Sequence, residues 1–272
     1  MSSNPYTKIM AKNRLPEELK KFGNIFDSLS RRHGTYYIFQ DFLDLSINAW
    51  SLDYKMDLVA IRKKYTEKER QLFGQLIHET IHILDRMIVS DNDFYDVFGT
   101  FYEANSLTNK HFAQFFTPLH VCQLMAQLTL DKEAQNFNDP CCGSARFSLA
   151  SNSVKPGMFH SLIDIDFTCA RMSALNLMYH GIHGIVICDN GLFAGKEFKG
   201  AFIVNRWLPY TKVPQIEFEP NVNRAYSYIR KKLGIVENEN PKGNPRTEPD
   251  INRNQEVANF IVNSKTNQIS LF

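Results

Sequence analysis

The first hundred residues place their apolar side chains three or four positions apart, with charged residues between them. This spacing predicts amphipathic helices over residues 16–29, 39–50 and 67–89. Short polar stretches at 31–34 and 90–93 separate these segments, as turns do. We therefore expect a small bundle of helices in the N-terminal part of the chain.

The pattern changes from about residue 112. Helical segments alternate there with short apolar runs, and three of these runs end at a polar residue, namely Asp164, Asp189 and Asn205. Alternation of strands and helices is typical of a mostly parallel sheet, whose ligands bind at the carboxyl ends of the strands. The sequence thus predicts an α/β fold with its chemistry at the strand ends. The predicted strands are 159–163, 184–188 and 200–204.

The composition changes again after Gly234. Residues 237–254 are rich in Asn, Pro, Glu and Arg and have almost nothing apolar to bury, which favours disorder or loose packing. The chain then becomes apolar from residue 260 to 272. The expected organisation has three parts: a helical N-terminal domain (1–108), an α/β domain (109–235) and a flexible C-terminal tail (236–272).

Bulk properties exclude little. The 272 residues are 43% hydrophobic and 22% charged, as in an ordinary soluble globular protein, and the net charge of +2 is too mild to indicate nucleic-acid binding or to exclude it. No apolar run approaches the ~20 residues of a membrane helix, and residues 1–15 do not resemble a signal peptide. An odd number of cysteines, five, favours reduced thiols in a cytoplasmic protein.

The segment 138–147, Asn-Asp-Pro-Cys-Cys-Gly-Ser-Ala-Arg-Phe, is the most informative. Asp139 at a strand end is followed by small residues that lead into a helix, so the backbone can approach a nucleotide-like ligand and offer it free N–H groups. Asp164 could accept both ribose hydroxyls and Asp189 an adenine amino group. Each aspartate could instead cap the following helix, but three along one sheet edge favour a binding site.

Several segments in order resemble the N-6 adenine-specific DNA methylase family, and most closely the modification subunits of type I restriction systems. Residues 113–118 resemble the family's Gln-Phe-Phe-Thr-Pro motif, and residues 139–144 resemble its Asp-Pro-x-Cys-Gly-Ser cofactor loop. The segments that begin at Ile163 and Cys188 are similar to its ribose-binding strand and adenine-contacting turn. Residues 96–103 resemble the segment that joins its helical and catalytic domains.

This resemblance implies a Rossmann-like methyltransferase core preceded by a helical domain, with S-adenosyl-L-methionine as cofactor and transfer of its methyl group to adenine N6 of DNA in a restriction-modification system. A separate specificity subunit would then supply DNA sequence recognition, because the chain lacks room for a recognition domain; no membrane partner is expected. The implied cofactor-binding residues are Phe116, Thr117, Pro118, Asp139, Cys141, Gly143, Ser144, Asp164, Ile165, Asp189 and Asn190.

The catalytic motif departs from the family pattern. Its Asn-Pro-Pro-aromatic sequence accepts hydrogen bonds from the target amine and stacks a ring on the flipped base. Here the motif reads Asn205-Arg206-Trp207-Leu208, so the resemblance implies Asn205 as acceptor and Trp207 or Tyr210 as the stacking ring. Without the prolines, methyl transfer is predicted to be weak or lost. The alternative is a non-catalytic accessory protein of the same fold that binds DNA or a sliding clamp.

The cofactor loop departs as well, because the family continues Gly-Ser-Gly-Gly where this chain has Ala145 and Arg146. If the first of these positions needs a positive φ, alanine costs on the order of 1 kcal/mol there. Arg146 could pair with the carboxylate of the cofactor.

Two further motifs are open to a functional interpretation. Residues 78–82, His-Glu-Thr-Ile-His, match the zinc-protease pattern H-E-x-x-H, but so short a pattern arises by chance and the helix has an ordinary apolar stripe, so no metal site is predicted. The last residues, Gln268 to Phe272, resemble the peptide that docks DNA-processing proteins onto the sliding clamp. The alternative is that this tail folds back onto the core.

Overall fold

The computed structural model describes residues 15–51, 58–90, 94–105, 107, 115–131 and 133–235, and two short strands, β6 (Ile261–Val262) and β7 (Ile269–Ser270). The predicted disordered segment 237–254 lies outside the described residues. Each predicted N-terminal helix falls on an observed one. In chain order the helices of this part are η1 (Glu17–Leu19), α2 (Lys20–His33), α3 (Thr35–Ala49), α4 (Leu58–Lys64), α5 (Glu67–Ser90) and α6 (Val97–Ala104). The predicted ranges correspond to α2, α3 and α5.

A cluster of phenylalanine rings holds α2, α3 and α6 together. Phe22 and Phe26 lie one turn apart on α2, as the predicted periodicity requires, and both are buried. Phe101 of α6 contacts both rings edge-on, at 4.8 Å between centroids. Phe39 and Phe42 of α3 complete the cluster. Because Phe101 stands five positions after Asp96, this cluster also fixes the segment that leads into the candidate site.

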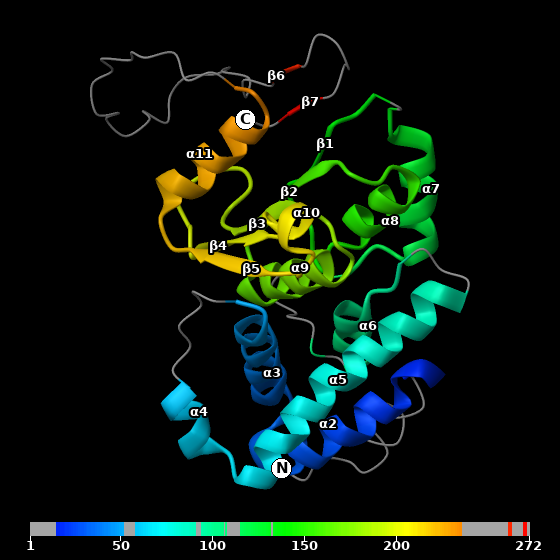
Figure 1. Ribbon diagram of the computed structural model, residues 1–272, viewed down its shortest axis with the longest axis vertical. Helices are drawn as coiled ribbons and strands as arrows, with labels where there is room; N and C mark the ends of the chain where they lie inside the picture. Colours follow the sequence, from blue (N-terminus) through cyan, green and yellow to red (C-terminus); the bar gives the residue numbers. More distant parts are fainter. Residues whose placement is uncertain are drawn as a thin grey trace, which may run out of the picture.

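The second half of the described chain forms a five-stranded mixed sheet with the order β1-β2-β3-β4-β5 (Figure 1). All three predicted strands are found. The first three strands are parallel to one another, and β4 and β5 are antiparallel to their neighbours. The strands are β1 (Asn136–Asp139), β2 (Phe159–Asp164), β3 (Gly184–Cys188), β4 (Gly200–Val204) and β5 (Ile216–Glu219). The fold is therefore α/β, as predicted, and is consistent with a methyltransferase fold.

The direction of β4 corrects the expectation of a mostly parallel sheet. Val204 lies opposite Gly184 and Gly200 lies opposite Cys188, so β4 runs against β3. Residues 189–199, which join the two strands, contain no helix. A return to a parallel strand needs a crossover of roughly a dozen or more residues, usually a helix, whereas an antiparallel neighbour does not. The C-terminal end of β4 consequently lies beside the N-terminal ends of the neighbouring strands, on the opposite side of the sheet from the C-terminal ends of β1, β2 and β3.

Helices cover the sheet on both faces. On one face α9 (Phe167–Tyr179) lies between the strands and α3, which is why every residue from Thr168 to Met178 is buried (Figure 1). On the other face Ala225 and Ile229 of α11 (Val222–Lys232) pack against the strands. The remaining helices are α7 (Leu119–Thr129), α8 (Arg146–Val154) and the short α10 (Leu208–Thr211). In the described part of the chain, no helix has the length and apolar character needed to cross a membrane.

Candidate cofactor site at the ends of β1 and β2

The loop between β1 and α8 is held against the end of β2 by backbone hydrogen bonds. The N–H of Cys142 donates to the carbonyl of Ile163 (2.9 Å), and the N–H of Gly143 donates to Oδ2 of Asp164 (2.8 Å). Within the loop, the N–H of Cys141 donates to Oδ1 of Asp139 (3.1 Å). Two carboxylates therefore flank a loop of small residues, and the loop reaches from one strand end to the next.

Two residues of this loop have left-handed backbone conformations. Gly143 has φ 55°, and a Cβ at this position would lie 2.9 Å from the ring of Phe116, so glycine is needed both for its conformation and for its size. Ala145 has φ 71°, and its conformation therefore carries the cost of about 1 kcal/mol that was expected for an alanine with positive φ.

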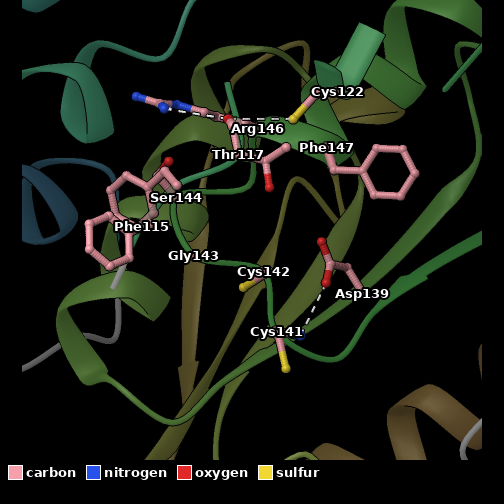
Figure 2. Close-up of a pocket in the computed structure, with 11 residues that line it drawn as sticks. Phe115, Thr117, Cys122, Asp139, Cys141, Cys142, Gly143, Ser144, Arg146 and Phe147 are labelled. Atoms are coloured by element: carbon pink, nitrogen blue, oxygen red, sulfur yellow. Dashed lines mark hydrogen bonds between the residues drawn. The ribbon is translucent and has the colours of Figure 1, made fainter. Parts of the chain in front are cut away.

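A cavity of about 70 Å³ lies beside the loop (Figure 2). It brings together six of the predicted cofactor residues: Phe116, Thr117, Asp139, Cys141, Gly143 and Ser144. The other lining residues are Phe115, Cys122, Cys142, Arg146 and Phe147. Pro118 is exposed and caps the start of α7 next to the cavity, whereas residues 113 and 114 lie outside the described residues.

Arg146 is bound to protein carboxylates. Its Nε atom lies 2.8 Å from Oδ2 of Asp96, and one terminal nitrogen lies 2.8 Å from Glu103. Its guanidinium also stacks on the ring of Phe116, at 5.4 Å from the centroid. The guanidinium is therefore already paired with two carboxylates of the protein. Its geometry does not support the expected pairing of Arg146 with a cofactor carboxylate.

Asp96 is the centre of the hydrogen-bond cluster behind the loop, and sequence reasoning missed it. The carboxylate is fully buried and accepts from the N–H of Gly99 (2.7 Å), the hydroxyl of Ser144 (2.6 Å), Nε of Arg146 (2.8 Å) and Nδ2 of Asn176 (2.8 Å). The only local signal is that Asp96 can cap α6, because its three other partners come from distant segments. The cluster fixes the start of α8 and hence the loop.

Asp164, the predicted ribose contact, lies at the end of β2 beside the loop. One oxygen accepts from Gly143, the other accepts from the N–H of Asp166 (2.9 Å), and the side chain is partly exposed. Burial raises the pKa of Asp164 to about 6, and the neighbouring carboxylates of Asp166 and Asp139 act in the same direction. Burial also raises the pKa of Asp139. Ile165 follows at the same edge, where its carbonyl accepts from Lys199 (3.1 Å), and it does not line the cavity.

Asp189 is not placed for the predicted adenine contact. Its carboxylate is fully buried and accepts from the N–H groups of Asn190, Gly195 and Glu197 and from the hydroxyl of Tyr226. Four donors therefore occupy both oxygens, and they fix the loop after β3. Asn190 takes part in the same loop, where its side chain accepts from Leu192 and donates to Glu197. Neither Asp189 nor Asn190 lines the cavity.

Asn205 lies far from the cavity. It follows β4 next to Gly184, which is about 13 Å along β3 from Cys188 at ~3.3 Å per residue. Its side chain is fully buried: Nδ2 lies within 3.1–3.2 Å of the carbonyls of residues 177, 178 and 182, and Oδ1 accepts from the N–H of Gln215. The amide thus holds the α9–β3 turn against the start of β5, with no atom left for a substrate amine.

The two candidate stacking rings also lie on that side of the sheet. Trp207 and Tyr210 are 48% and 79% exposed, with ring centroids 6.3 Å apart. Arg206 between Asn205 and Trp207 pairs with Glu217 of β5 (3.1 Å). The structure therefore does not bring the three predicted catalytic residues, Asn205, Trp207 and Tyr210, to the cofactor loop.

Parallel strands that end in carboxylates beside a loop of small residues are typical of α/β domains that bind nucleotide-like ligands at the strand ends. Residues 90–204 match the family model described as N-6 DNA Methylase. The match supports a DNA methyltransferase in general and covers less than half of the chain. It contains Asp96, the loop and the first four strands, and it ends one residue before Asn205. No curated protein matches the chain, and no solved structure does.

Proposed function

We propose that this chain is a relative of the adenine-N6 DNA methyltransferases that binds S-adenosylmethionine at the β1–β2 edge and does not transfer a methyl group through Asn205. The observation that carries the second half of the proposal is the antiparallel β4, which puts Asn205 at the far edge of the sheet with its amide fully bonded. The matched family generally uses S-adenosylmethionine, which supports the first half.

The residues present fit part of this cofactor. A carboxylate that is partly exposed at the end of β2, Asp164, suits the ribose hydroxyls. The cavity of about 70 Å³ is well below the ~300 Å³ of pockets that enclose a whole ligand, so it suits only the amino-acid end of the molecule. Adenine would have to be held without Asp189, whose oxygens are occupied.

When bound, S-adenosylmethionine supplies an electrophilic methyl group on its sulfonium. The chain's own contribution at this edge is binding and orientation. Gly143 lets the loop backbone approach a ligand, and Asp164 accepts hydrogen bonds from hydroxyl groups when it is deprotonated, above a pH of about 6. Asp96 and Arg146 position the loop from behind.

The test combines titration calorimetry with a methyl-transfer assay. S-adenosylmethionine should bind the intact chain, and Asp164→Asn, which keeps the shape of the side chain, should weaken binding by at least about tenfold, since a charged acceptor of ligand hydroxyls is lost. The matched control is Asp131→Asn, at an exposed position before β1. Absence of binding to the intact chain, or equal affinity of Asp164→Asn, would refute the cofactor site.

The second arm uses radiolabelled cofactor and unmethylated genomic DNA. We expect no label in adenine, or an incorporation that Trp207→Ala leaves unchanged. Incorporation that is lost in Trp207→Ala would show that the far edge of the sheet carries out the reaction and would overturn this half of the proposal.

The finer expectations stay proposals. They are a place among the type I modification subunits, DNA as the bound partner, a separate specificity subunit, a cytoplasmic location and docking of residues 268–272 on a sliding clamp. The family match is to the general methylase model, and residues 268, 271 and 272 lie outside the described residues.

A further inference from the structure

Helix α5 carries a pair of exposed histidines on adjacent turns. His78 and His82 stand four positions apart, a spacing that places two side chains on the same face of a helix. Their Nε2 atoms lie 2.8 Å apart, and their ring centroids lie 4.3 Å apart with the planes at 80°. Two imidazole nitrogens therefore converge on one point at the surface, outside the candidate cofactor site.

The ion pairs of Glu79 rule out a zinc-protease arrangement for the H-E-x-x-H motif. In that arrangement the glutamate acts as a base next to the metal. Glu79 is instead buried, at 3% exposure, and it pairs with Lys21 of α2 and Arg86. Its carboxylate ties α5 to α2 while the two histidines face solvent. Among the described residues, no group of three or more His, Cys, Asp or Glu side chains could hold a metal ion.

We propose that His78 and His82 form a two-ligand site for a divalent transition-metal ion that accepts nitrogens at about a right angle, Ni²⁺ or Cu²⁺, with water in its other positions. An ion about 2.0–2.1 Å from each nitrogen would have an N–metal–N angle of about 84–89° at the observed 2.8 Å separation. Tetrahedral Zn²⁺ would need the nitrogens about 3.3 Å apart. Square-planar nitrogen sites are typical of Cu²⁺ and Ni²⁺.

The proton between the rings does not prevent binding. At 2.8 Å one Nε2–H donates to the lone pair of the other Nε2, so one nitrogen is already unprotonated, and a metal ion would replace the hydrogen bond at its lone pair. The donor ring exposes its own lone pair when its proton moves to Nδ1, a change of tautomer with no net loss of a proton. Both imidazoles are then neutral ligands. The site is independent of the function proposed above.

The site is tested with Ni²⁺ alone and with Zn²⁺ for comparison, by calorimetric titration of the full chain. All variants carry Cys141→Ser, because Cys141 is an exposed thiol that would itself bind these ions. We expect one Ni²⁺ per chain, bound more tightly than Zn²⁺. His78→Ala and His82→Ala should each weaken Ni²⁺ binding at least about tenfold, since loss of even an outer-shell partner costs 10–100-fold.

The matched control is His120→Ala, which removes an exposed histidine on α7 and should leave Ni²⁺ binding unchanged. Alanine is the strongest helix former, so α5 should persist in both histidine variants, and circular dichroism checks this. No Ni²⁺ binding, equal affinity in His78→Ala and His82→Ala, or tighter binding of Zn²⁺ than of Ni²⁺ would each overturn the proposal.

Discussion

Substitution of Asn205 separates a structural role of this residue from a catalytic one. Its amide is buried with both ends bonded to backbone groups, and its backbone has φ 55°. Two variants divide these contributions: Asn205→Gly removes the hydrogen bonds and keeps a residue that accepts the left-handed conformation, whereas Asn205→Ala also introduces a residue that is strained there.

The magnitude follows from the bonds that are lost. The two N–H groups of the amide and its oxygen make three effective hydrogen bonds, at about 1 kcal/mol net each. Asn205→Gly should therefore lower the free energy of unfolding by about 3 kcal/mol, and Asn205→Ala by about 4 kcal/mol, since the left-handed conformation costs alanine about 1 kcal/mol more. Such losses are a large part of the ~5–15 kcal/mol of an average domain.

Urea unfolding followed by circular dichroism measures these free energies. The control is Trp207→Ala, since Trp207 is a candidate catalytic residue that is half exposed and should change the free energy by less than about 1 kcal/mol. The reasoning is refuted if Asn205→Gly and Asn205→Ala unfold like the unmodified protein and lose a methyl-transfer activity that the unmodified protein has. That result would mean that Asn205 acts on a substrate.

Three more predictions concern the cofactor loop and its support. Gly99→Ala should lower the free energy of unfolding in urea by about 2–3 kcal/mol, because the new Cβ would lie 2.1 Å from Oδ2 of Asp96 and 2.4 Å from the hydroxyl of Ser144; an unchanged value would contradict the cluster. Burial raises the pKa of Asp164 to about 6 in the folded state, so the free energy of unfolding should fall by about 1–3 kcal/mol as the pH rises from about 4 to 6. A series of urea unfolding curves at different pH measures this fall. Asp164→Asn should lack it, and the same fall in that variant would show that Asp164 is not its source. Cys141 is exposed and the other four cysteines are buried, so a maleimide should label the folded protein at Cys141 alone and more slowly with S-adenosylmethionine present; mass spectrometry locates the label, and equal rates with and without the cofactor would count against a site at this loop.

Much of the fold could be predicted because its signals are local. Phe22 and Phe26 repeat at helical spacing, and the three apolar runs are long enough for strands and too short for helices. The same is true of the loop at the end of β1: its acidic residue, small residues and following helix are adjacent in the sequence, and the structure brings six of the eleven predicted cofactor residues around one cavity.

The direction of β4 could not be read from the strand itself. A buried apolar run that ends at Asn205 looks the same whether it lies parallel or antiparallel to its neighbour, since the difference is in the connection. The eleven residues from 189 to 199 carry no helical pattern, and their shortness was the available signal. The resemblance of residues 205–208 to the family's Asn-Pro-Pro-aromatic motif favours a position at the cofactor loop, whereas the antiparallel β4 puts Asn205 next to Gly184, at the other end of β3.

The hydrogen-bond partners of Asp189 could not be predicted from the sequence for a different reason. Its carboxylate accepts hydrogen bonds partly from loop N–H groups and partly from the hydroxyl of Tyr226, which lies 37 positions later on α11. A strand-end aspartate that binds a ligand and one that organises its own loop have the same local sequence. Only the packing of α11 against the sheet distinguishes them.

The Asp96 cluster has a consequence for the order in which the protein acquires its properties. The carboxylate collects donors 48, 50 and 80 positions away in the chain, so it is completed only when these distant segments have met. Contacts of such long sequence separation slow folding, because the entropy of closing the intervening loops is lost before the contacts form. The loop between β1 and α8 gains its final shape only when these segments have met, so affinity for a ligand there reports that the chain from Asp96 to Asn176 has assembled.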